Sequence, residues 1–421
     1  MQPYDCIIAD ISKFKRQALQ WAASFDVACF LDSNQYSNPY SSYTTVIAAG
    51  VSKEICSNSG NALGELSNFL NNNKLFIPGF FSYDLKNEIE QLHSNNQDGL
   101  EFLDLYFFVP RHLLLIKGNE VRIITDKPNL LEEINAQVLP DQEVHFDGTI
   151  HSTLTKEAYI DKVNQIKEHI KKGDIYEMTF CQQFFSVCKS FNPLAAYLQL
   201  NSISPAPFST FFKIRDKYII SSSPERFLKK EGLMVISQPI KGTAARSADL
   251  IEDNRLKEDL RSNLKEQAEN IMIVDLVRND LTRTAVPGSV EVKELCGIYS
   301  FEQVHQMIST ITARVSATTK NIDIIKNAFP MGSMTGAPKI KAMELIELYE
   351  ETKRGIYSGS VGYFDSNGNF DFNVIIRSLI YNKSKKYLSF QVGSAITFAS
   401  DPELEYQECM LKAKAMLKVL S

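Results

Sequence analysis

Short apolar runs separated by polar turns dominate residues 1–150, and this pattern predicts β-strands. Residues 43–49, 75–83, 111–117 and 120–125 read as strands, and Gly118-Asn119 between the last two predicts a hairpin. We find no recognisable chemistry in this part. We therefore expect residues 1–150 to be a variable N-terminal part that supplies half of a sheet, and residues 151–421 to carry the function.

The second part mixes helical and strand periods. Helices are predicted at 155–172, at 250–280 in two segments, at 339–349, and from Asp401-Pro402 onward. Strands are predicted at 209–214 and 217–222 as a hairpin, at 233–238, at 371–380 and at 386–393. Helix and strand are thus mixed in one α+β chain, and a fixed short repeat is not found.

Two segments flank the predicted strand 233–238. Ser223-Pro224-Glu225-Arg226-Phe227 lies before it and Pro239-Ile240-Lys241-Gly242-Thr243 lies after it. A carboxyl group and an amine at the two ends of one strand can share a pocket as general acid and nucleophile. Taken alone, the pair is more often a surface acid and a solvated loop lysine.

Paired glutamates on predicted helices suggest a metal site. Glu266 and Glu269 share one helix face, and Glu405 and Glu408 are again three apart in the last helix. Each pair alone is more often a solvated face. The six histidines have no metal-ligand spacing, and the seven cysteines contain no Cys-x-x-Cys pair, so disulfides and zinc are disfavoured. Two carboxylate pairs in such a chain predict Mg²⁺ held by oxygen.

Two further features suggest an anionic ligand. Gly332, Gly336 and Pro338 lead into the helix at 339–349, whose first N–H groups can bind a carboxylate, although a simple capped helix entry is equally consistent. Arg377 interrupts the apolar run 371–380, and a cation in a buried strand needs an anionic partner.

Composition restricts the class of partner. The chain has 421 residues, 44% hydrophobic residues and a net charge of -5, with acidic and basic residues interspersed. It therefore has neither the basic footprint of a nucleic-acid binder nor that of a protein bound to an anionic membrane. The sequence has no basic, apolar signal segment at its start and no apolar run long enough to span a bilayer, which predicts a cytoplasmic protein with a small-molecule substrate.

The motifs together resemble one family. Ser-Pro-Glu-Arg-Phe, Pro-Ile-Lys-Gly-Thr, Lys-Glu-x-x-Glu-Asn, Phe-Pro-x-Gly-Ser-x-Thr-Gly-Ala-Pro-Lys and Asp-Pro-x-x-Glu-Tyr-x-Glu occur in order between residues 155 and 420, as in the chorismate-utilising enzymes. The resemblance implies two large antiparallel β-sheets packed face to face and flanked by helices. It places the pocket between strands of the second part and the two glutamate-bearing helices.

Lys241 distinguishes the branches of this family. Anthranilate synthases resemble Pro-Ile-Ala-Gly-Thr at this point, whereas a lysine marks the branch that makes 4-amino-4-deoxychorismate for p-aminobenzoate and folate. In that branch the lysine is thought to add to C2 of chorismate with loss of the C4 hydroxyl, and ammonia then enters at C4 and expels it. The resemblance makes Glu225 the general acid, and a neutral amine predicts a lowered pKa for Lys241. Anthranilate synthase component I is the alternative.

Other roles follow from the resemblance, position by position. It implies that the Mg²⁺ ligands are Glu266, Glu269, Glu405 and Glu408, with Glu269 and Glu408 most direct. It implies that the chorismate-binding residues are Gly242, Thr243, Thr335, Tyr357, Arg377, Gly393 and Lys412. His305, which the local pattern alone predicts to be packed on a helix, matches a catalytic histidine near the reacting ring.

The chain also departs from the family pattern. Glu177 stands where relatives usually have Gln and where isochorismate and salicylate synthases have a water-activating lysine, so an extra carboxylate is expected near the amine. Gly393-Ser394-Ala395 replaces a more glycine-rich turn of the family. If Ser394 or Ala395 narrows the carboxylate site, substrate affinity is expected to fall. An amidotransferase motif is not found, which predicts ammonia from a separate glutaminase subunit. The Leu-Leu-Glu-Ser motif that binds tryptophan in anthranilate synthases is not found, and Cys29-Phe30-Leu31-Asp32-Ser33 is only weakly similar to it.

Overall fold

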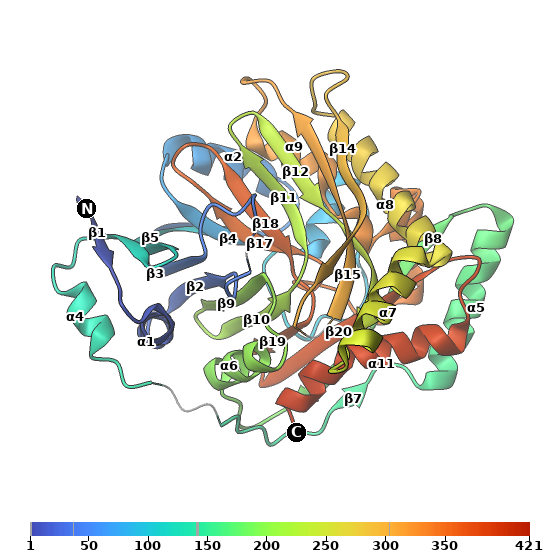
Figure 1. Ribbon diagram of the computed structural model, residues 1–421, viewed down its shortest axis with the longest axis horizontal. Coiled ribbons are helices and arrows are strands. Elements are labelled where there is room, and N and C mark those ends of the chain that lie inside the picture. The colour runs from blue at the N-terminus through green and yellow to red at the C-terminus, as the bar shows by residue number, and fades with distance from the viewer. Residues whose placement is uncertain (1, 37, 140–142, 303) are drawn as a thin grey trace.

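A computed structural model describes residues 2–36, 38–139, 143–302 and 304–421 (Figure 1). The helices are α1 (Ile11–Ala23), α2 (Ala62–Asn72), α3 (Lys86–Ile89), α4 (Leu130–Asn135), α5 (Lys156–Lys172), α6 (Pro193–Ile203), α7 (Leu250–Ser262), α8 (Leu264–Thr282), α9 (Asn321–Ala328), α10 (Lys339–Tyr349) and α11 (Pro402–Val419), with short 3-10 turns η1 (Tyr83–Leu85) and η2 (Gly332–Met334).

The strands in chain order are β1 (Gln2–Ile7), β2 (Val27–Asp32), β3 (Thr45–Ser57), β4 (Ile77–Phe81), β5 (Leu105–Lys117), β6 (Glu120–Thr125), β7 (His151–Ser152), β8 (Glu177–Val187), β9 (Phe208–Ile214), β10 (Lys217–Ser223), β11 (Arg226–Glu231), β12 (Met234–Gln238), β13 (Ile240–Ala245), β14 (Glu291–Ser300), β15 (Val304–Arg314), β16 (Gly336–Ala337), β17 (Ser360–Phe364), β18 (Phe370–Val374), β19 (Ser378–Asn382) and β20 (Tyr387–Ile396). All pairings between these strands are antiparallel.

The strands form two sheets that share β3 and β5. The first runs β1, β6, β5, β3, β2, β9, β10, β19, β20, β8, with β7 and β16 both paired to β8. The second runs β3, β5, β4, β17, β18, β11, β12, β15, β14, with β13 also paired to β15. The long strand β5 pairs with β4 through its first half and with β6 through its second half, so the two sheets are one continuous ladder.

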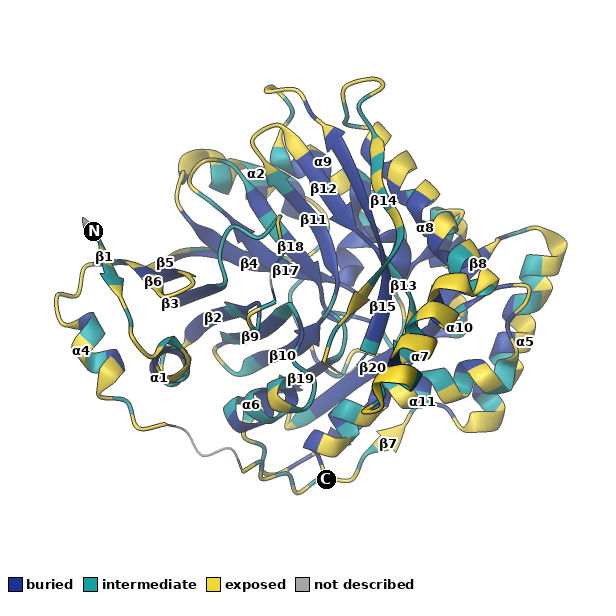
Figure 2. Cartoon of the chain, viewed as in Figure 1, coloured by how far each residue is buried: buried dark blue, intermediate teal, exposed yellow. Residues whose placement is uncertain are grey.

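Three apolar clusters hold the layers together. One lies between the sheets, where Phe80 of β4 and Phe212 of β9 make an edge-to-face contact at 5.7 Å between ring centroids. A second packs α1, α4, α5, α6, α10 and α11 on the first sheet, and a third packs α2, α8 and α9 on the second. The helices show a buried stripe toward the sheets and an exposed outer face (Figure 2). The predicted face-to-face sheets flanked by helices are confirmed.

Local signals placed several helix ends correctly. The Thr155 side chain accepts from the Ala158 N–H at the start of α5, and Gly173 ends that helix with φ of 82°. Asp401 caps α11, with Pro402 at its first position. The predicted helices at 250–280 and 339–349 and the hairpins at Gly118-Asn119 and 215–216 are also confirmed.

Two local predictions are wrong. The run 371–380 is not one strand, because β18 ends at Val374 and β19 begins at Ser378, with Arg377 between them at φ of 53°. His305 lies on β15, not on a helix. Both residues lie in segments whose conformation is imposed by neighbouring strands rather than by their own pattern.

Residues 1–150 are built into both sheets. β2 pairs with β9 in the first sheet, and β4 pairs with β17 in the second. The predicted boundary near residue 150 is followed by β7 and α5, and residues 140–142 just before it lie outside the described part. The division into residues 1–150 and 151–421 therefore stays a prediction about variability, since the strands of both parts are interleaved.

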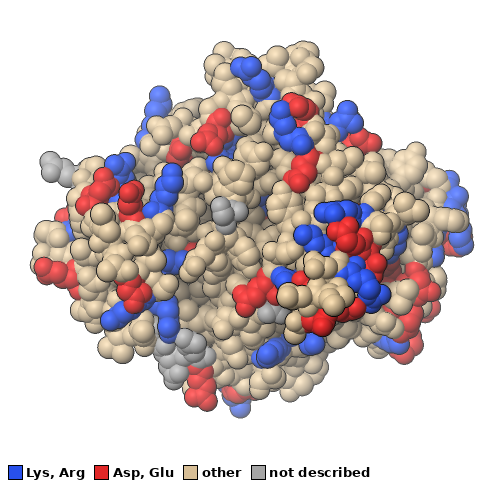
Figure 3. All heavy atoms as spheres, in the orientation of Figure 1, with Lys and Arg blue, Asp and Glu red and all other residues tan. Residues whose placement is uncertain are grey.

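Acidic and basic side chains are interspersed on the face seen in Figure 3. Among the described helices, none combines the length and the apolar character that crossing a bilayer requires.

Candidate active site

The amine of Lys241 and the carboxylate of Glu177 form a buried ion pair. Nζ of Lys241 donates to Oε1 of Glu177 at 2.7 Å, and the two side chains are 10% and 0% exposed. The residues are 64 positions apart, on β13 and β8. The expected extra carboxylate near the amine is therefore present and in direct contact with it.

The start of β8 is fixed by the segment between η2 and α10. Ala337 pairs with Glu177 in the β16–β8 ladder, and a Cβ on Gly336 would lie 2.1 Å from the Glu177 carbonyl oxygen, so only glycine fits there. Met178 and Phe180 pack toward the helices over the first sheet. Because side chains alternate along a strand, Glu177 points to the opposite face, toward the second sheet.

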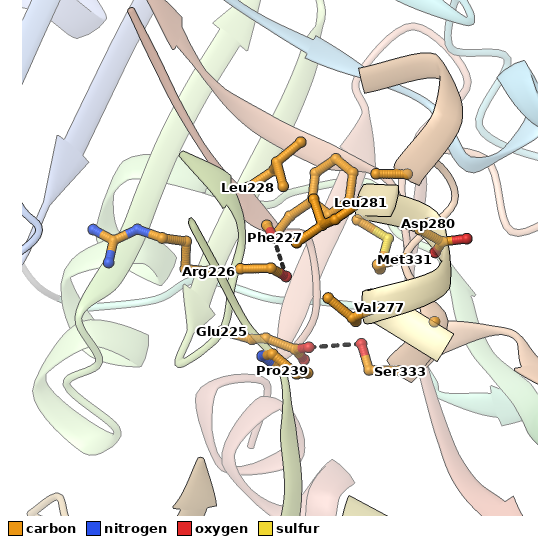
Figure 4. Close-up of a pocket in the computed structure, with 13 residues that line it drawn as sticks. Glu225, Arg226, Phe227, Leu228, Pro239, Val277, Asp280, Leu281, Met331 and Ser333 are labelled. Atoms are coloured by element: carbon orange, nitrogen blue, oxygen red, sulfur yellow. Dashed lines mark hydrogen bonds between the residues drawn. The ribbon is translucent and has the colours of Figure 1, made fainter. Parts of the chain in front are cut away.

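Glu225 lies in the same region with its carboxylate buried. The hydroxyl of Ser333 donates to Oε1 of Glu225 at 2.6 Å (Figure 4). Burial raises the pKa of Glu225 to about 7, although the Ser333 hydrogen bond and the charge of Lys241 act in the opposite direction. A carboxyl group with this pKa can hold a proton near neutral pH and deliver it to a leaving group.

A small cavity lies beside Glu225, between β11, α8 and η2. Phe227, Val277, Leu281 and Met331 give it an apolar lining, while the Arg226 side chain points away from it (Figure 4). This surrounding explains the raised pKa of Glu225, because apolar walls disfavour the charged form of a carboxyl group.

The predicted lowering of the Lys241 pKa is wrong for this state of the protein. Burial alone would lower the pKa of Lys241, but the carboxylates of Glu177, Glu269 and Glu225 outweigh it and raise the pKa above its ordinary value. The amine therefore carries a proton in the free protein and must lose it before it can act as a nucleophile.

The four predicted metal ligands lie on α8 and α11, which face each other here. Lys265 connects the helices, with Nζ 3.1 Å from Oε1 of Glu405 and 3.6 Å from Oε1 of Glu269. Burial and the charge of Glu408 raise the pKa of Glu266. Burial raises the pKa of Glu269 to about 7 against the opposing charges of Lys241 and Lys265.

The donor set fits a hard cation in its chemistry. Oε1 of Glu269 is buried and makes no hydrogen bond to a described residue, only the 3.6 Å ion pair with Lys265, and a carboxylate oxygen is a ligand that Mg²⁺ prefers. The other two predicted ligands form ion pairs with lysines. Lys265 pairs with Glu405, and Nζ of Lys412 lies 2.6 Å from Oε1 of Glu408. Among the described residues, no group of three or more potential metal ligands lies close together. For Mg²⁺ to bind all four glutamates, Lys265 would have to release Glu405, and Lys412 would have to release Glu408.

Of the predicted carboxylate-binding residues, Tyr357 and Arg377 lie in loops, and Lys412 lies on α11. Arg377 is half-buried, its guanidinium makes no hydrogen bond or ion pair to another described residue, and burial lowers its pKa. Tyr357 is 5% exposed, and its hydroxyl accepts from Sγ of Cys181 at 3.9 Å. Thr335 is fully buried, and its hydroxyl donates to the carbonyl of Met331 at 3.1 Å.

Gly393 and Lys412 meet directly. Nζ of Lys412 donates to the carbonyl oxygen of Gly393 at 2.9 Å. A Cβ on Gly393 would lie 2.4 Å from Sγ of Cys181, so this position tolerates only glycine. Ser394 does not narrow the site, because its hydroxyl meets that of Tyr159 on the helix side at 3.1 Å. Ala395 shares the face of Gly393.

Gly242 brings the lysine segment against α8. It has φ of 92°, and a Cβ there would lie 3.0 Å from Oε2 of Glu266. Glycine is favoured by both the left-handed backbone and the close approach. Thr243 next to it is exposed.

His305 is not brought against Lys241 by any hydrogen bond. Its Nε2 lies 3.1 Å from Oδ1 of Asp253, and its Nδ1 lies 2.8 Å from the Ser300 hydroxyl. Both ring nitrogens are therefore engaged by neighbours on α7 and β14, and its catalytic role stays a prediction.

Two residues of the site were not singled out from the sequence. Ser333 belongs to a quoted motif, and its place among small residues was the only signal for its hydrogen bond to Glu225. Asn270 follows Glu269, and its Nδ2 donates to the carbonyl oxygens of Lys241 at 3.4 Å and of Met307 at 3.3 Å. It fixes the backbone of the lysine from α8.

Comparison with known proteins identifies the family. The family model described as chorismate binding enzyme matches residues 26–418. Aminodeoxychorismate synthase component 1 of Escherichia coli is 35% identical over 350 residues, covering 81% of this chain and 76% of that protein. An anthranilate synthase component I-like protein of Synechocystis is 35% identical over 353 residues, covering 81% and 72%.

A solved structure shares the fold. Anthranilate synthase component I from Streptococcus pneumoniae superimposes with a TM-score of 0.79 at 25% identity, covering 90% of this chain and 93% of that one. The match of the family model over nearly the whole chain, together with these relatives, decides the classification. The chain belongs to the family of chorismate binding enzymes.

Proposed function

We propose that the protein is an aminodeoxychorismate synthase, which converts chorismate and ammonia to 4-amino-4-deoxychorismate for p-aminobenzoate and folate synthesis. The observation that carries the proposal is Lys241, an amine in a buried group of carboxylates that includes Glu177 and Glu225. The similarity to the Escherichia coli aminodeoxychorismate synthase component 1 supports it. Ammonia would come from a separate glutamine amidotransferase subunit.

Lys241 and Glu225 would share the first half of the reaction. Nζ of Lys241 forms a bond to C2 of chorismate, both ring double bonds shift by one position, and the C4–O bond breaks. The proton of Glu225 joins the departing hydroxide as water. The 2.7 Å hydrogen bond to Oε1 of Glu177 provides an acceptor for the proton that Lys241 must lose.

Ammonia would complete the reaction. Its nitrogen forms a bond to C4, both ring double bonds shift back, and the C2–N bond to Lys241 breaks, which returns the lysine. The surplus proton of the new C4 ammonium group can return to Glu225, so the sum is chorismate plus ammonia giving product plus water.

The site residues would hold the two carboxylates of chorismate. Arg377 offers a guanidinium that makes no hydrogen bond or ion pair to a described residue, although the charge of Glu408 acts on it, and Lys412 reaches the backbone of Gly393. Glu266, Glu269, Glu405 and Glu408 would hold Mg²⁺, which would neutralise a substrate carboxylate.

The alternative, anthranilate synthase component I, is supported by the solved structure of that name. Product analysis separates the two. Purified protein with chorismate, Mg²⁺ and ammonium is expected to release 4-amino-4-deoxychorismate, and formation of anthranilate without an added lyase would contradict the proposal. A non-catalytic chorismate-binding subunit would bind chorismate without turnover at high ammonium.

The covalent step has its own test. With chorismate and Mg²⁺ but without ammonium, intact-protein mass spectrometry is expected to find an adduct of chorismate less one water. The adduct should map to Lys241 and be absent from Lys241→Ala. Unchanged product and rate in Lys241→Ala would exclude the lysine as nucleophile.

The metal requirement is tested separately. Chelation is expected to abolish turnover, and Mg²⁺ to restore it and to raise the melting temperature of the chelated protein. Glu269→Gln should weaken both effects of Mg²⁺. A chelated protein with full activity would exclude a required metal.

A further inference from the structure

Glu177 has one carboxylate oxygen whose hydrogen-bonding capacity is unused. Oε1 accepts from Lys241 at 2.7 Å, whereas Oε2 is buried and has no hydrogen-bond partner among the described residues. The residue is 0% exposed. An ionised carboxylate can accept about four hydrogen bonds, and leaving a buried oxygen without any costs free energy.

This oxygen lies on the site side of the sheet. Glu177 alternates with Met178, which packs under the helices, and its backbone is held against Ala337 of β16. The two oxygens of a carboxylate are only about 2.2 Å apart, as C–O bonds near 1.25 Å require, so Oε2 remains close to Nζ of Lys241.

The local charge admits a second cation. The carboxylates of Glu177 and Glu269 both act on Lys241, Glu269 also lies 3.6 Å from Nζ of Lys265, and burial favours the protonated form of Glu225. A small N–H donor of positive charge would satisfy the unpaired Oε2 of Glu177.

We propose that Glu177 forms the binding site for the second amine of the reaction, with Oε2 accepting hydrogen bonds from an ammonium ion or ammonia beside Lys241. This proposal rests on the proposed function, in which two nitrogens bond in turn to C2 and C4 of one ring.

The geometry of one carboxylate suits that pair of nitrogens. The carbons C2 and C4 are separated by one atom and lie about 2.5 Å apart, given C–C bonds near 1.5 Å. Two amines held on the two oxygens of Glu177 are likewise a few ångströms apart. One side chain thus places both nucleophiles beside the carbons they attack.

The kinetic test is Glu177→Gln in the full-length protein, with ammonium varied at saturating chorismate and chorismate varied at saturating ammonium. The amide keeps a neutral acceptor but loses the charge, so the ammonium KM should rise about tenfold while the chorismate KM stays unchanged. A fall in kcat alone, with the ammonium KM unchanged, would mean that Glu177 serves only Lys241 and would overturn the proposal.

The chain provides a matched control. Glu347 pairs with the fully buried Lys86 at 2.8 Å outside the described site. Glu347→Gln removes the same charge from a comparable pair, and the ammonium KM should not change. An equal rise in both variants would show a non-specific effect of lost charge and would overturn the proposal.

A binding readout does not depend on the reaction. Thallium(I) is a cation similar in size to ammonium, and its anomalous scattering locates it in crystals soaked with thallium acetate in the presence of Mg²⁺. We expect a peak in contact with Glu177 that ammonium displaces and that Glu177→Gln lacks. Thallium confined to Glu266, Glu269, Glu405 and Glu408, or absent from the site, would overturn the proposal.

The two proposals can fail independently. If the product is anthranilate, the proposed function is wrong, yet the ammonium KM and the thallium peak still test Glu177. If 4-amino-4-deoxychorismate forms but neither readout responds to Glu177→Gln, the proposed function stands and the ammonium site does not.

Discussion

The hydroxyl of Ser333 donates a 2.6 Å hydrogen bond to the carboxylate of Glu225, across 108 residues of chain. Most of the residues that line the small cavity beside this contact are apolar, among them Phe227 and Val277. Ser333 favours the charged form of Glu225 and burial favours the neutral form, and burial is the larger effect. The balance puts the proton affinity of Glu225 in the range that a general acid needs.

Glu225→Gln is expected to stabilise the fold at alkaline pH. The carboxyl pKa rises from 4.5 in the unfolded chain to about 7 in the fold, so the folded state binds the proton more tightly. Its contribution to stability is therefore present below pH 4.5 and lost as pH rises to 7, a penalty of up to about 3 kcal/mol.

Urea unfolding across pH 5 to 8 checks this prediction. The variant should exceed the native protein in unfolding free energy at pH 8, and the difference should shrink toward pH 5. Glu258→Gln, at an exposed position, should show no such trend. A difference that grows toward low pH would contradict a raised pKa.

Glu225→Gln should also lose turnover about 10²- to 10⁴-fold, because it lacks the general acid.

Ser333→Ala should shift the pH profile without removing the acid. Loss of the hydrogen bond that favours the carboxylate raises the pKa of Glu225 further, so the alkaline limb of kcat/KM should move up by about one pH unit. Ser209→Ala removes a buried hydroxyl elsewhere and should leave the limb in place. If the alkaline limb of kcat/KM does not move in Ser333→Ala, Glu225 is not the group whose titration causes that limb.

Arg377→Asn should weaken chorismate binding and stabilise the fold. Arg377 combines a half-buried guanidinium with φ of 53°, a backbone conformation that Asn adopts more easily than Arg. We expect the chorismate KM to rise about 10- to 100-fold and the unfolding free energy to increase by about 1 kcal/mol.

The control is Lys386→Asn, at an exposed turn with φ of 54°. It should relieve the same backbone conformation and leave the chorismate KM unchanged. If Arg377→Asn lowers both stability and affinity, the guanidinium has a structural partner in solution and is not reserved for substrate.

Arg354→Met should be among the most destabilising single changes. Its guanidinium is 1% exposed, donates to Glu350 at 2.6 and 2.9 Å, and also donates to the carbonyl oxygens of Met334 and Thr179. Removing it strands a buried carboxylate and should cost about 3 to 5 kcal/mol.

Urea unfolding measures this cost against Arg255→Met, which breaks the exposed pair with Glu252 and should cost under about 1 kcal/mol. The double change Arg354→Met with Glu350→Leu should recover part of the loss, because the stranded charge is then gone. Equal effects of the two single variants would contradict a dominant role for burial.

Much of the fold was accessible from sequence where the signals are local. Thr155, Gly173 and Asp401 mark helix ends through contacts within one turn, and Gly118-Asn119 marks a hairpin. The prediction of one strand at 371–380 was wrong because the break at Arg377 depends on contacts that are distant in the chain. β18 pairs with β11 and β17, whereas β19 pairs with β10 and β20. Such pairings leave no trace in a short window.

The sequence by itself determined which chemical groups the site contains: an acid, an amine and two pairs of glutamates on helices of the right period. Only the tertiary structure decided their states. Lys241 was expected to have a lowered pKa, yet the carboxylates that β8 and α8 bring around it raise that pKa. Glu177 became its direct partner through the β16–β8 ladder. Residue type fixes the chemistry available, but charge and burial depend on neighbours that are distant in the chain.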